Sequence, residues 1–325
     1  MLHVRHALRD APEVRHTLAE FHFGVDARAS GDPRHIPVTL AQLGGDARVE
    51  RWSTDAAVET GNFGAFAFAQ DGDCLFASLV VPADQCIDIE RVTRSSYLRL
   101  DHLIRRQGYP YWLRAWNYLA DITGGNGEAE RYRRFNAGRY SAVGLSSGIE
   151  QNLPAASALG MDNSSDSDGF VLCCLAGKRP GMQIENPRQL SAPLYPPRYG
   201  LRSPMFARAA LVPNGRGAQL LVSGTASIVG HESLHIGDPD RQLEETARNF
   251  EALVDTAMRA AADRPRASSV RLESLKVYLR NPDDYQRLLP GVRRLFAVEN
   301  EPLVLRADIC RRELLVEIEG TYALE

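Results

Sequence analysis

The second half of the chain alternates strand-like and helix-like segments in an order that few folds accommodate. Two apolar, β-forming runs, 205–212 and 218–229, flank the turn signal Asn214-Gly215 and predict a hairpin. We then expect a helix, a strand, a shorter helix and two closing strands over 239–262, 268–280, 282–289, 302–310 and 313–324, with Asp238 and Asn281 as helix caps. Because helices do not separate every pair of strands, this order predicts an α+β fold, a mixed sheet with its helices on one face.

A proline-rich stretch precedes this region and marks a change in composition. Six prolines fall between Pro180 and Pro204, after the polar run MDNSSDSDGF at 161–170. Proline lacks the N–H that a central strand or a helix interior needs, so the stretch predicts an irregular connection. We place a domain boundary there, with an N-terminal α/β domain over 1–180 and a C-terminal domain over 181–325. Long irregular connections in compact proteins commonly form the lid or wall of a site.

The N-terminal domain gives weaker signals. Strands are predicted at 64–70 and 75–82, and helices at 92–106 and 128–135. A further break at Arg264-Pro265 is expected to end the long helix of the C-terminal domain.

Composition excludes several classes of protein. The 325 residues carry 38 Lys and Arg against 41 Asp and Glu, which argues against a nucleic-acid binder held by a basic surface. No run of about 18 apolar residues is present, so a membrane partner is not expected either. Five cysteines without a C-x-x-C spacing indicate free thiols in a reducing, cytoplasmic setting.

Residues 231–235, HESLH, match the H-E-x-x-H pattern of zinc peptidases. In those enzymes both imidazoles lie one turn apart on a helix, and the glutamate polarises a zinc-bound water. Here Gly237 and Pro239 follow at once and leave no room for that helix. A strand-to-helix loop is favoured and no bound metal is expected. A zinc-dependent hydrolase is kept as an alternative, with the candidate residues His231, Glu232 and His235.

Two other patterns have ordinary structural interpretations. The glycine-rich stretch 124–127 lacks the lysine and hydroxyl residue of a phosphate-binding loop, so a plain loop is expected. Cys173 and Cys174 alternate across a predicted strand, which predicts one buried thiol beside a less buried one rather than a redox pair.

Two charged patterns are candidates for a site. Four arginines fall within 131–139, interleaved with aromatic residues, and suit either a solvated helix face or the capture of carboxylates by planar guanidinium groups. Near the C-terminus, Glu317 and Glu319 share one face of a predicted strand. A glutamate that points from such a strand into an enclosed site has its pKa raised by desolvation, as a general acid requires. A solvated strand face is the alternative.

Several long strings resemble the chorismatase family. They are WLRAWNYLADIT, RYRRFNAGR, PLYPPRYGLRSPMFARA, SGTASIVGHES and LRADICRRELLVEIEG, spread over 111–320. The resemblance implies a two-domain α+β fold with a degenerate RidA-like N-terminal domain. Its C-terminal domain would be similar to RidA/YjgF proteins and to chorismate mutase, and would end in the V-E-I-E strand. The strand and helix order inferred above agrees with this.

The resemblance also implies roles for individual residues. The first glutamate of the V-E-I-E strand, Glu317, would be the catalytic acid, and Cys310 would shape the site and assist proton removal. Members that form 3-hydroxybenzoate carry the counterparts of Cys310 and Gly224, where strict hydrolases have alanine. The residues expected to hold the substrate are Arg134, Arg139, Arg202, Tyr199, Gly224, Thr225 and Arg306.

The expected activity is conversion of chorismate to 3-hydroxybenzoate and pyruvate, with 4-hydroxybenzoate as a second aromatic product, in secondary metabolism such as pigment biosynthesis. Glu317 would protonate the enolpyruvyl methylene, and the neighbouring ring oxygen rather than water would attack. The atoms balance without a redox cofactor or metal, so none is expected.

Alternatives to this activity remain open. They are a chorismate hydrolase giving a dihydroxycyclohexadiene carboxylate, the zinc hydrolase, and a RidA-like binding or imine-hydrolysing protein. Chorismate is the expected partner, and the oligomeric state is open, with internal pseudo-symmetry allowing a monomer.

Overall fold

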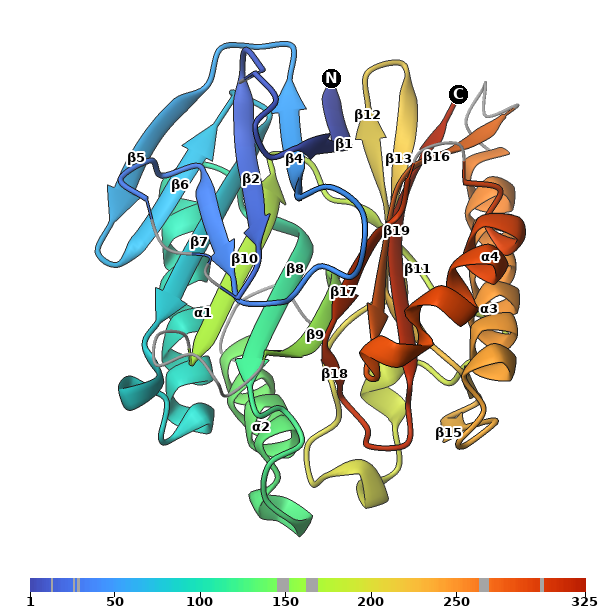
Figure 1. Cartoon of the computed structure of the whole chain (residues 1–325). Helices are drawn as coiled ribbons and strands as arrows, with labels where there is room; N and C mark the ends of the chain where they lie inside the picture. The colour runs from blue at the N-terminus through green and yellow to red at the C-terminus, as the bar shows by residue number, and fades with distance from the viewer. Residues whose placement is uncertain are drawn as a thin grey trace.

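A computed structural model describes residues 1–12, 14–25, 27, 30–144, 152–161, 169–262, 269–298 and 301–325. Most of the polar run at 161–170 and the Arg264-Pro265 break lie outside the described residues. In the described part of the chain, three large sheets are packed between two pairs of helices (Figure 1). No helix among the described residues is both long and apolar enough to cross a membrane.

The N-terminal part builds two of these sheets. The four-stranded sheet has the order β1 (Leu2–Leu8), β4 (Arg48–Thr54), β2 (Thr17–Phe23) and β3 (His35–Val38). The seven-stranded sheet has the order β18 (Asp308–Ile309), β9 (Ala155–Met161), β8 (Tyr111–Ala120), β10 (Phe170–Gly177), β7 (Cys74–Val81), β6 (Phe66–Gln70) and β5 (Glu59–Phe63). Helices α1 (Ile89–Arg106) and α2 (Arg131–Val143) pack on one face of this second sheet.

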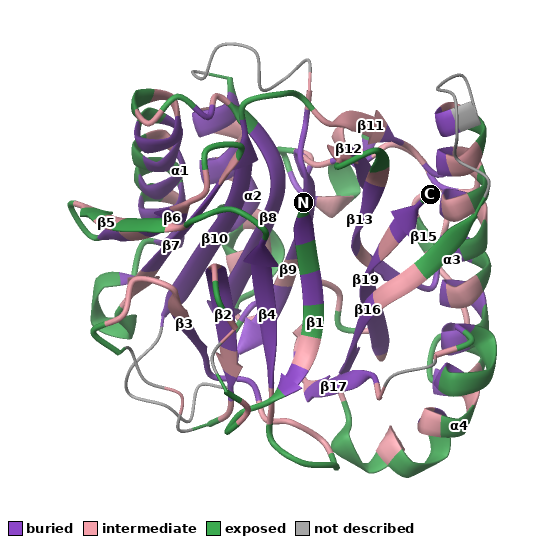
Figure 2. Ribbon diagram, turned by 90° about the horizontal axis from the view of Figure 1, so that it is seen from above, coloured by how far each residue is buried: buried purple, intermediate pink, exposed green. Residues whose placement is uncertain are grey.

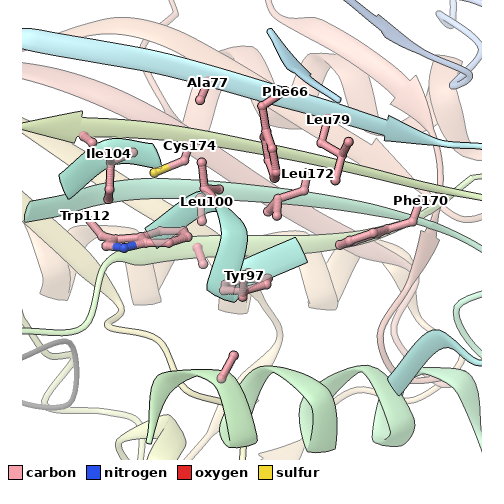
Figure 3. Close-up of a cluster of buried hydrophobic side chains, with 14 of the residues drawn as sticks. Phe66, Ala77, Leu79, Tyr97, Leu100, Ile104, Trp112, Phe170, Leu172 and Cys174 are labelled. Carbon is pink, nitrogen blue, oxygen red and sulfur yellow. The ribbon is translucent and has the colours of Figure 1, made fainter. Parts of the chain in front are cut away.

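The core beneath α1 follows from the spacing of its apolar residues. Leu100 and Ile104 lie one turn apart and are fully buried against strand residues such as Leu172 (Figure 3). Tyr97 of the same helix stacks on Trp112, with ring centroids 5.4 Å apart. Burying each large apolar side chain of this kind stabilises the fold by roughly 1.5–3 kcal/mol.

Cys173 and Cys174 do alternate across β10, but the expected difference in burial was wrong. Both thiols are fully buried, with Cys174 in the core under the helices and Cys173 in the core between the sheets. The four-stranded sheet covers the second face of β10, so neither side of that strand meets solvent. The sequence of one strand does not show that another sheet packs on its second face.

The C-terminal part forms the third sheet. Its strands are β11 (Met182–Ile184), β12 (Ala209–Asn214), β13 (Gly217–Ala226), β19 (Val316–Leu324), β16 (Val270–Leu279) and β17 (Leu303–Arg306). From β12 onward, the main strands and helices follow the predicted order along the chain, with the short β11 as an edge strand that was not predicted. Helices α3 (Pro239–Ala262) and α4 (Tyr285–Leu295) pack together on its outer face, at the opposite side of the molecule from α1 (Figure 2). The α+β prediction, with both helices on one face, is therefore confirmed.

The predicted hairpin of this part is confirmed, whereas the predicted end of the shorter helix is not. The β12–β13 hairpin turns at Asn214 and Gly215, where Gly215 has φ +60°, a conformation that suits glycine. The predicted end of the last helix at Leu289 was wrong, since α4 continues past Pro290 to Leu295. Leu288 and Val292, four residues apart, are both buried in the core and hold the helix across the proline.

The closing strand expected over 302–310 is divided between two sheets. β17 pairs with β16, but β18 leaves that sheet and pairs with Leu159 and Gly160 of β9. The chain thus passes from the C-terminal sheet to the edge of the seven-stranded sheet.

The predicted boundary at 180 falls between β10 and β11, and the assignment of two domains remains a proposal.

Four buried charged side chains join the two parts, and we call them the interdomain ion cluster: Glu50, Arg114, Lys276 and Glu319. Lys276 Nζ lies 3.0 Å from Glu50 Oε2 and 2.6 Å from Glu319 Oε1. Arg114 Nη2 lies 2.7 Å from Glu319 Oε2. Burial alone would raise the pKa of Glu50, but Lys276 and His6 beside it lower it to about 2.

Candidate active site

A cavity of about 380 Å³ lies where β9, β13 and β19 meet. Its walls come from α2, from the proline-rich stretch and from residues 310–314, which we call the cavity segment. The lining residues used below are Ser157, Gly224 and Glu317 on strands, Arg139 on α2, Tyr195, Arg198, Tyr199 and Arg208 before β12, and Cys310 and Arg311 on the cavity segment. The proline-rich stretch is therefore a wall of a cavity, as its composition predicts.

The position of Glu317 depends on an irregularity in the neighbouring strand. The β13–β19 ladder pairs Val222 with Gly320 and resumes at Thr225, with a shift of register between. At the shift, the Gly224 N–H donates a hydrogen bond to Ser157 Oγ at 2.8 Å. A Cβ atom on Gly224 would lie 2.1 Å from Glu317 Oε1. Only glycine leaves room for the carboxyl in this position.

Glu317 is suited to hold a proton at neutral pH. Its residue is 4% exposed. Burial and the neighbouring Glu319 anion together raise its pKa to about 8, against the opposing charges of Arg114, Arg280 and Arg208. A buried carboxylic acid that opens onto a cavity can deliver a proton to a bound ligand.

Glu319, two residues along the same face of β19, has the opposite character. Burial would raise its pKa, but the Lys276 and Arg114 cations lower it below its usual value. Its carboxylate also accepts hydrogen bonds from Trp116 Nε1 at 3.1 Å and from the Tyr278 hydroxyl at 3.0 Å. The two carboxyl groups are therefore held in different protonation states, and Glu317 is the member of the pair that has a proton to donate at neutral pH.

Cys310 lies at the start of the cavity segment and lines the cavity. Burial raises the pKa of its thiol to about 12, and the Glu317 carboxyl contributes in the same direction. The thiol is therefore neutral at physiological pH. This argues against the expected role of Cys310 in removing a proton, and leaves the role of shaping the cavity.

Two buried arginines that line the cavity have side-chain nitrogens without a hydrogen-bond partner in the described part of the chain. Arg139 is 3% exposed, and its Nε and Nη2 have no hydrogen-bond partner among the described residues. Arg208 is 4% exposed; its Nη2 donates to the Leu190 carbonyl at 2.8 Å and to the Tyr195 hydroxyl at 2.7 Å, while its Nε has no partner in the described part. Leaving buried cationic donors unpaired is costly, so this pair indicates an anionic ligand.

The other lining arginines have protein partners. Arg311 stacks on Tyr199, with its guanidinium carbon 4.0 Å from the ring centroid, and donates to the His231 carbonyl at 2.9 Å. Arg198 pairs with Glu232 at 2.8 Å at the rim of the cavity.

Four of the expected substrate contacts do not line this cavity. Arg134 is exposed and pairs with Asp88 and Glu90. Arg202 stacks on Tyr140, and Arg306 lies beside Asp308. The Thr225 hydroxyl donates to the Ser223 carbonyl at 2.9 Å. Of the expected set, Arg139, Tyr199 and Gly224 do line the cavity together with Glu317 and Cys310.

The H-E-x-x-H residues lie on a small ribbon of β14 (Ile228–Val229) and β15 (Glu232–Ser233), not on a helix. His231 Nδ1 is 2.8 Å from Arg198 Nη2, and His235 Nε2 is 3.4 Å from Glu245. The string therefore lacks the geometry of a zinc peptidase motif.

A different set gathers three potential ligands within 4.8 Å among the described residues: Glu20, His22 and His35. Arg51 and His22 already pair with the Glu20 carboxylate, which accounts for that grouping as an ion pair network.

Comparisons with known proteins identify the family. A family model described as "Chorismatase FkbO/Hyg5-like, N-terminal" matches residues 50–176. A 3-hydroxybenzoate synthase from Streptomyces hygroscopicus is 36% identical over 278 residues, covering 83% of this chain and 80% of that protein. This chain belongs to the chorismatase family. A chorismatase from Streptomyces rapamycinicus is 33% identical over 312 residues, covering 93% of this chain and 90% of that one.

A solved chorismatase structure, a crystal structure at 1.08 Å resolution, agrees with this chorismatase fold. The TM-score is 0.84 at 28% identity, and the match covers 99% of this chain and 98% of the other. The fold class and the family inferred from the sequence strings are both confirmed.

Arg208 and Arg311 are lining residues of this chorismatase that sequence reasoning missed. Arg208 left a signal, because it is the one charged residue in the apolar run 205–212. A charge inside a run that is expected to be buried needs a partner or a ligand. Arg311 left no comparable signal, since it precedes another arginine in a polar turn.

Proposed function

We propose that this chorismatase converts chorismate to 3-hydroxybenzoate and pyruvate, with 4-hydroxybenzoate as a minor product. The observation that carries the proposal is Glu317, a buried acid with a raised pKa at an arginine-lined cavity. The names of the related 3-hydroxybenzoate synthase and chorismatases support the same substrate and product. The reaction balances atom for atom and needs no redox step.

In this proposal Arg139 and Arg208 hold the two carboxylates of the substrate. Both are buried and have N–H donors without a partner among the described residues. A ligand carboxylate that accepts two hydrogen bonds from one guanidinium would satisfy these donors. Holding both ends of the substrate fixes the enolpyruvyl group against Glu317, which lowers the entropic cost of the proton transfer.

Glu317 then donates its proton to the enolpyruvyl methylene carbon. The ether oxygen becomes a good leaving group, and pyruvate departs. Glu319 supports this step as a fixed anion, because its charge keeps the proton on Glu317 until the substrate takes it. The Ser157 hydroxyl connects Glu319 to the strand that carries Gly224, because it donates a hydrogen bond to Glu319 and accepts one from the Gly224 N–H.

Product choice is assigned to Cys310 and Gly224. The neutral thiol occupies the cavity wall and excludes water from the reacting carbon, while Gly224 allows Glu317 its position. The oxygen of the neighbouring ring hydroxyl therefore attacks the ether-bearing ring carbon as the bond from that carbon to the departing pyruvate oxygen breaks, and the hydroxyl proton passes to the ionised Glu317. The arene oxide so formed opens, and transfer of the proton on that ring carbon to the oxygen restores aromaticity.

The test is incubation of the purified protein with chorismate, followed by separation of the products. We expect pyruvate and hydroxybenzoate in equal amounts, with the 3-isomer in excess. Run in deuterated water, the reaction should place one deuterium in the pyruvate methyl group. A dihydroxy acid as main product would replace the benzoate-forming assignment by the hydrolase, and unconsumed chorismate would refute both.

A further inference from the structure

Arg280 follows β16 and reaches across to the cavity segment. Its Nε donates a hydrogen bond to the Leu314 carbonyl at 2.8 Å. Its Nη2 donates to the Ile309 carbonyl at 2.8 Å and to the Arg311 carbonyl at 3.1 Å. Its Nη1 lies 2.7 Å from Asp308 Oδ1. One guanidinium thus binds backbone oxygens at both ends of the cavity segment.

The cavity segment has little regular structure of its own, since residues 310–315 lie between strands and include a turn. Other side-chain contacts also brace it. Ser233 Oγ donates to Glu313 Oε1 at 2.7 Å, and Arg312 of the segment donates to the Gly125 carbonyl at 3.0 Å. The Gln242 amide of α3 donates to the Glu313 carbonyl at 2.9 Å and accepts the Leu315 N–H at 2.7 Å. The shape of the segment therefore depends on side chains from other elements, and Arg280 binds the carbonyls on both sides of Cys310, those of Ile309 and Arg311.

We propose that Arg280 is a positioning residue for product choice. By fixing the cavity segment, it keeps the Cys310 thiol against the cavity and so keeps water from the reacting carbon. The inference rests on the proposed function. Arg280 is not among the described residues that line the cavity, so it acts through the segment and not by contact with the substrate.

The charge of Arg280 has a second effect that can be measured separately. The groups that interact with Glu317 are Glu319, Arg114, Arg280, Arg208, Cys310 and Tyr132. Among them, the Arg280 cation lowers the pKa of Glu317. Without that cation the pKa of Glu317 rises, and an acid that must be protonated then stays active to higher pH.

Two substitutions separate geometry from charge. Arg280→Lys keeps a cation but lacks the planar fork that reaches three carbonyls, and Arg280→Met loses both. For each variant, pyruvate release from chorismate is measured against pH, and the ratio of hydroxybenzoate to dihydroxy acid is measured by product separation. We expect both variants to lower that ratio at least several-fold. We expect only Arg280→Met to move the alkaline limit of activity to higher pH.

The matched control is Arg293→Met. Arg293 is an exposed arginine of the same half, paired with Glu301 at 2.7 Å and without contact to the cavity segment. Arg293→Met should leave both the ratio of hydroxybenzoate to dihydroxy acid and the alkaline limit of activity unchanged. Circular dichroism and the thermal midpoint establish that each variant is folded. Should Arg280→Met fail to fold, Arg280→Lys decides the test.

An unchanged product ratio in the folded Arg280 variants would overturn the inference while leaving the proposed function in place. A wild-type protein that does not consume chorismate would overturn the proposed function and the inference with it. A reduced pyruvate rate with a wild-type product ratio would assign Arg280 a merely structural role and would also contradict the inference.

Discussion

Glu317 and Glu319 show how two identical side chains on one strand face acquire different chemistry. Glu319 lies among Lys276, Arg114 and three further hydrogen-bond donors, and it stays ionised. Glu317 is buried beside that anion, so desolvation and the Glu319 charge disfavour its ionised form. The strand pattern predicts that they share a face, but not which of them loses its charge.

Glu317 should reduce the stability of the protein above its unfolded pKa. Its folded pKa of about 8 exceeds the ordinary value of 4.5, so folding must bind a proton between these pH values. Glu317→Gln removes that cost, and we expect it to raise the free energy of unfolding by about 3 kcal/mol at neutral pH. Below pH 4.5 the two proteins should be equally stable. Urea unfolding at several pH values measures this; a difference that does not grow with pH would contradict it.

Cys310 should determine the product and not the rate. We expect Cys310→Ala combined with Gly224→Ala to shift the products toward the dihydroxy acid, because water enters where the thiol stood. Cys310→Ala alone should keep pyruvate release, whereas Gly224→Ala should also slow it, since the added methyl displaces the Glu317 carboxyl. Product separation after reaction in labelled water checks both; an unchanged ratio in the double variant would remove Cys310 from product control.

Among the helices and strands, those with a regular residue pattern could be predicted from the sequence, whereas irregular segments could not. The β12–β13 hairpin and α3 follow from turn residues and apolar spacing, which are local in the sequence. The β18 crossing and the register shift at Gly224 depend on pairing with β9 and on the approach of Glu317. Such long-range contacts leave no periodic pattern, and they are what form the site.

The packing of α2 on α1 should control Arg139. A Cβ atom on Gly138 would lie 2.3 Å from the Glu90 carbonyl oxygen of α1, so Gly138→Ala must separate the helices. We expect a loss of about 1–3 kcal/mol in unfolding free energy and a raised KM for chorismate, because the neighbouring arginine moves.

The control is Gly291→Ala in α4, where the new methyl meets the end of the Leu243 side chain at 3.0 Å. Denaturant unfolding compares the unfolding free energies of the two variants, and steady-state kinetics compares their KM values for chorismate. Equal effects of the two substitutions would show that the helix contact does not position Arg139.

At the scale of the whole molecule, the interdomain ion cluster links strands that the sequence places far apart. β4 provides Glu50, β8 provides Arg114, and β16 and β19 provide Lys276 and Glu319. The cluster is adjacent to the site through the hydrogen bond from Ser157 to Glu319. The packing of the two parts and the chemistry of Glu317 therefore depend on the same group of charges.

Lys276→Met tests whether the packing of the two parts depends on these charges. It leaves two buried carboxylates without their shared cation, which typically costs about 3–5 kcal/mol. Urea unfolding measures the loss, and Lys178→Met, at an exposed lysine, should change stability by less than about 0.5 kcal/mol. A variant of Lys276 as stable as the wild type would mean that the cluster contributes no net stability.

Pyruvate release from Glu317→Gln shows whether Glu317 is the proton donor in chorismate cleavage. Glu313→Gln, at another lining glutamate, is the matched control. We expect Glu317→Gln to retain its fold and to lose at least about 100-fold in kcat, because an amide cannot protonate carbon. Glu313→Gln should stay within a few-fold of the wild type, whose activity should fall as the pH rises through about 8. Pyruvate release by folded Glu317→Gln at a rate within a few-fold of the wild type would contradict the account.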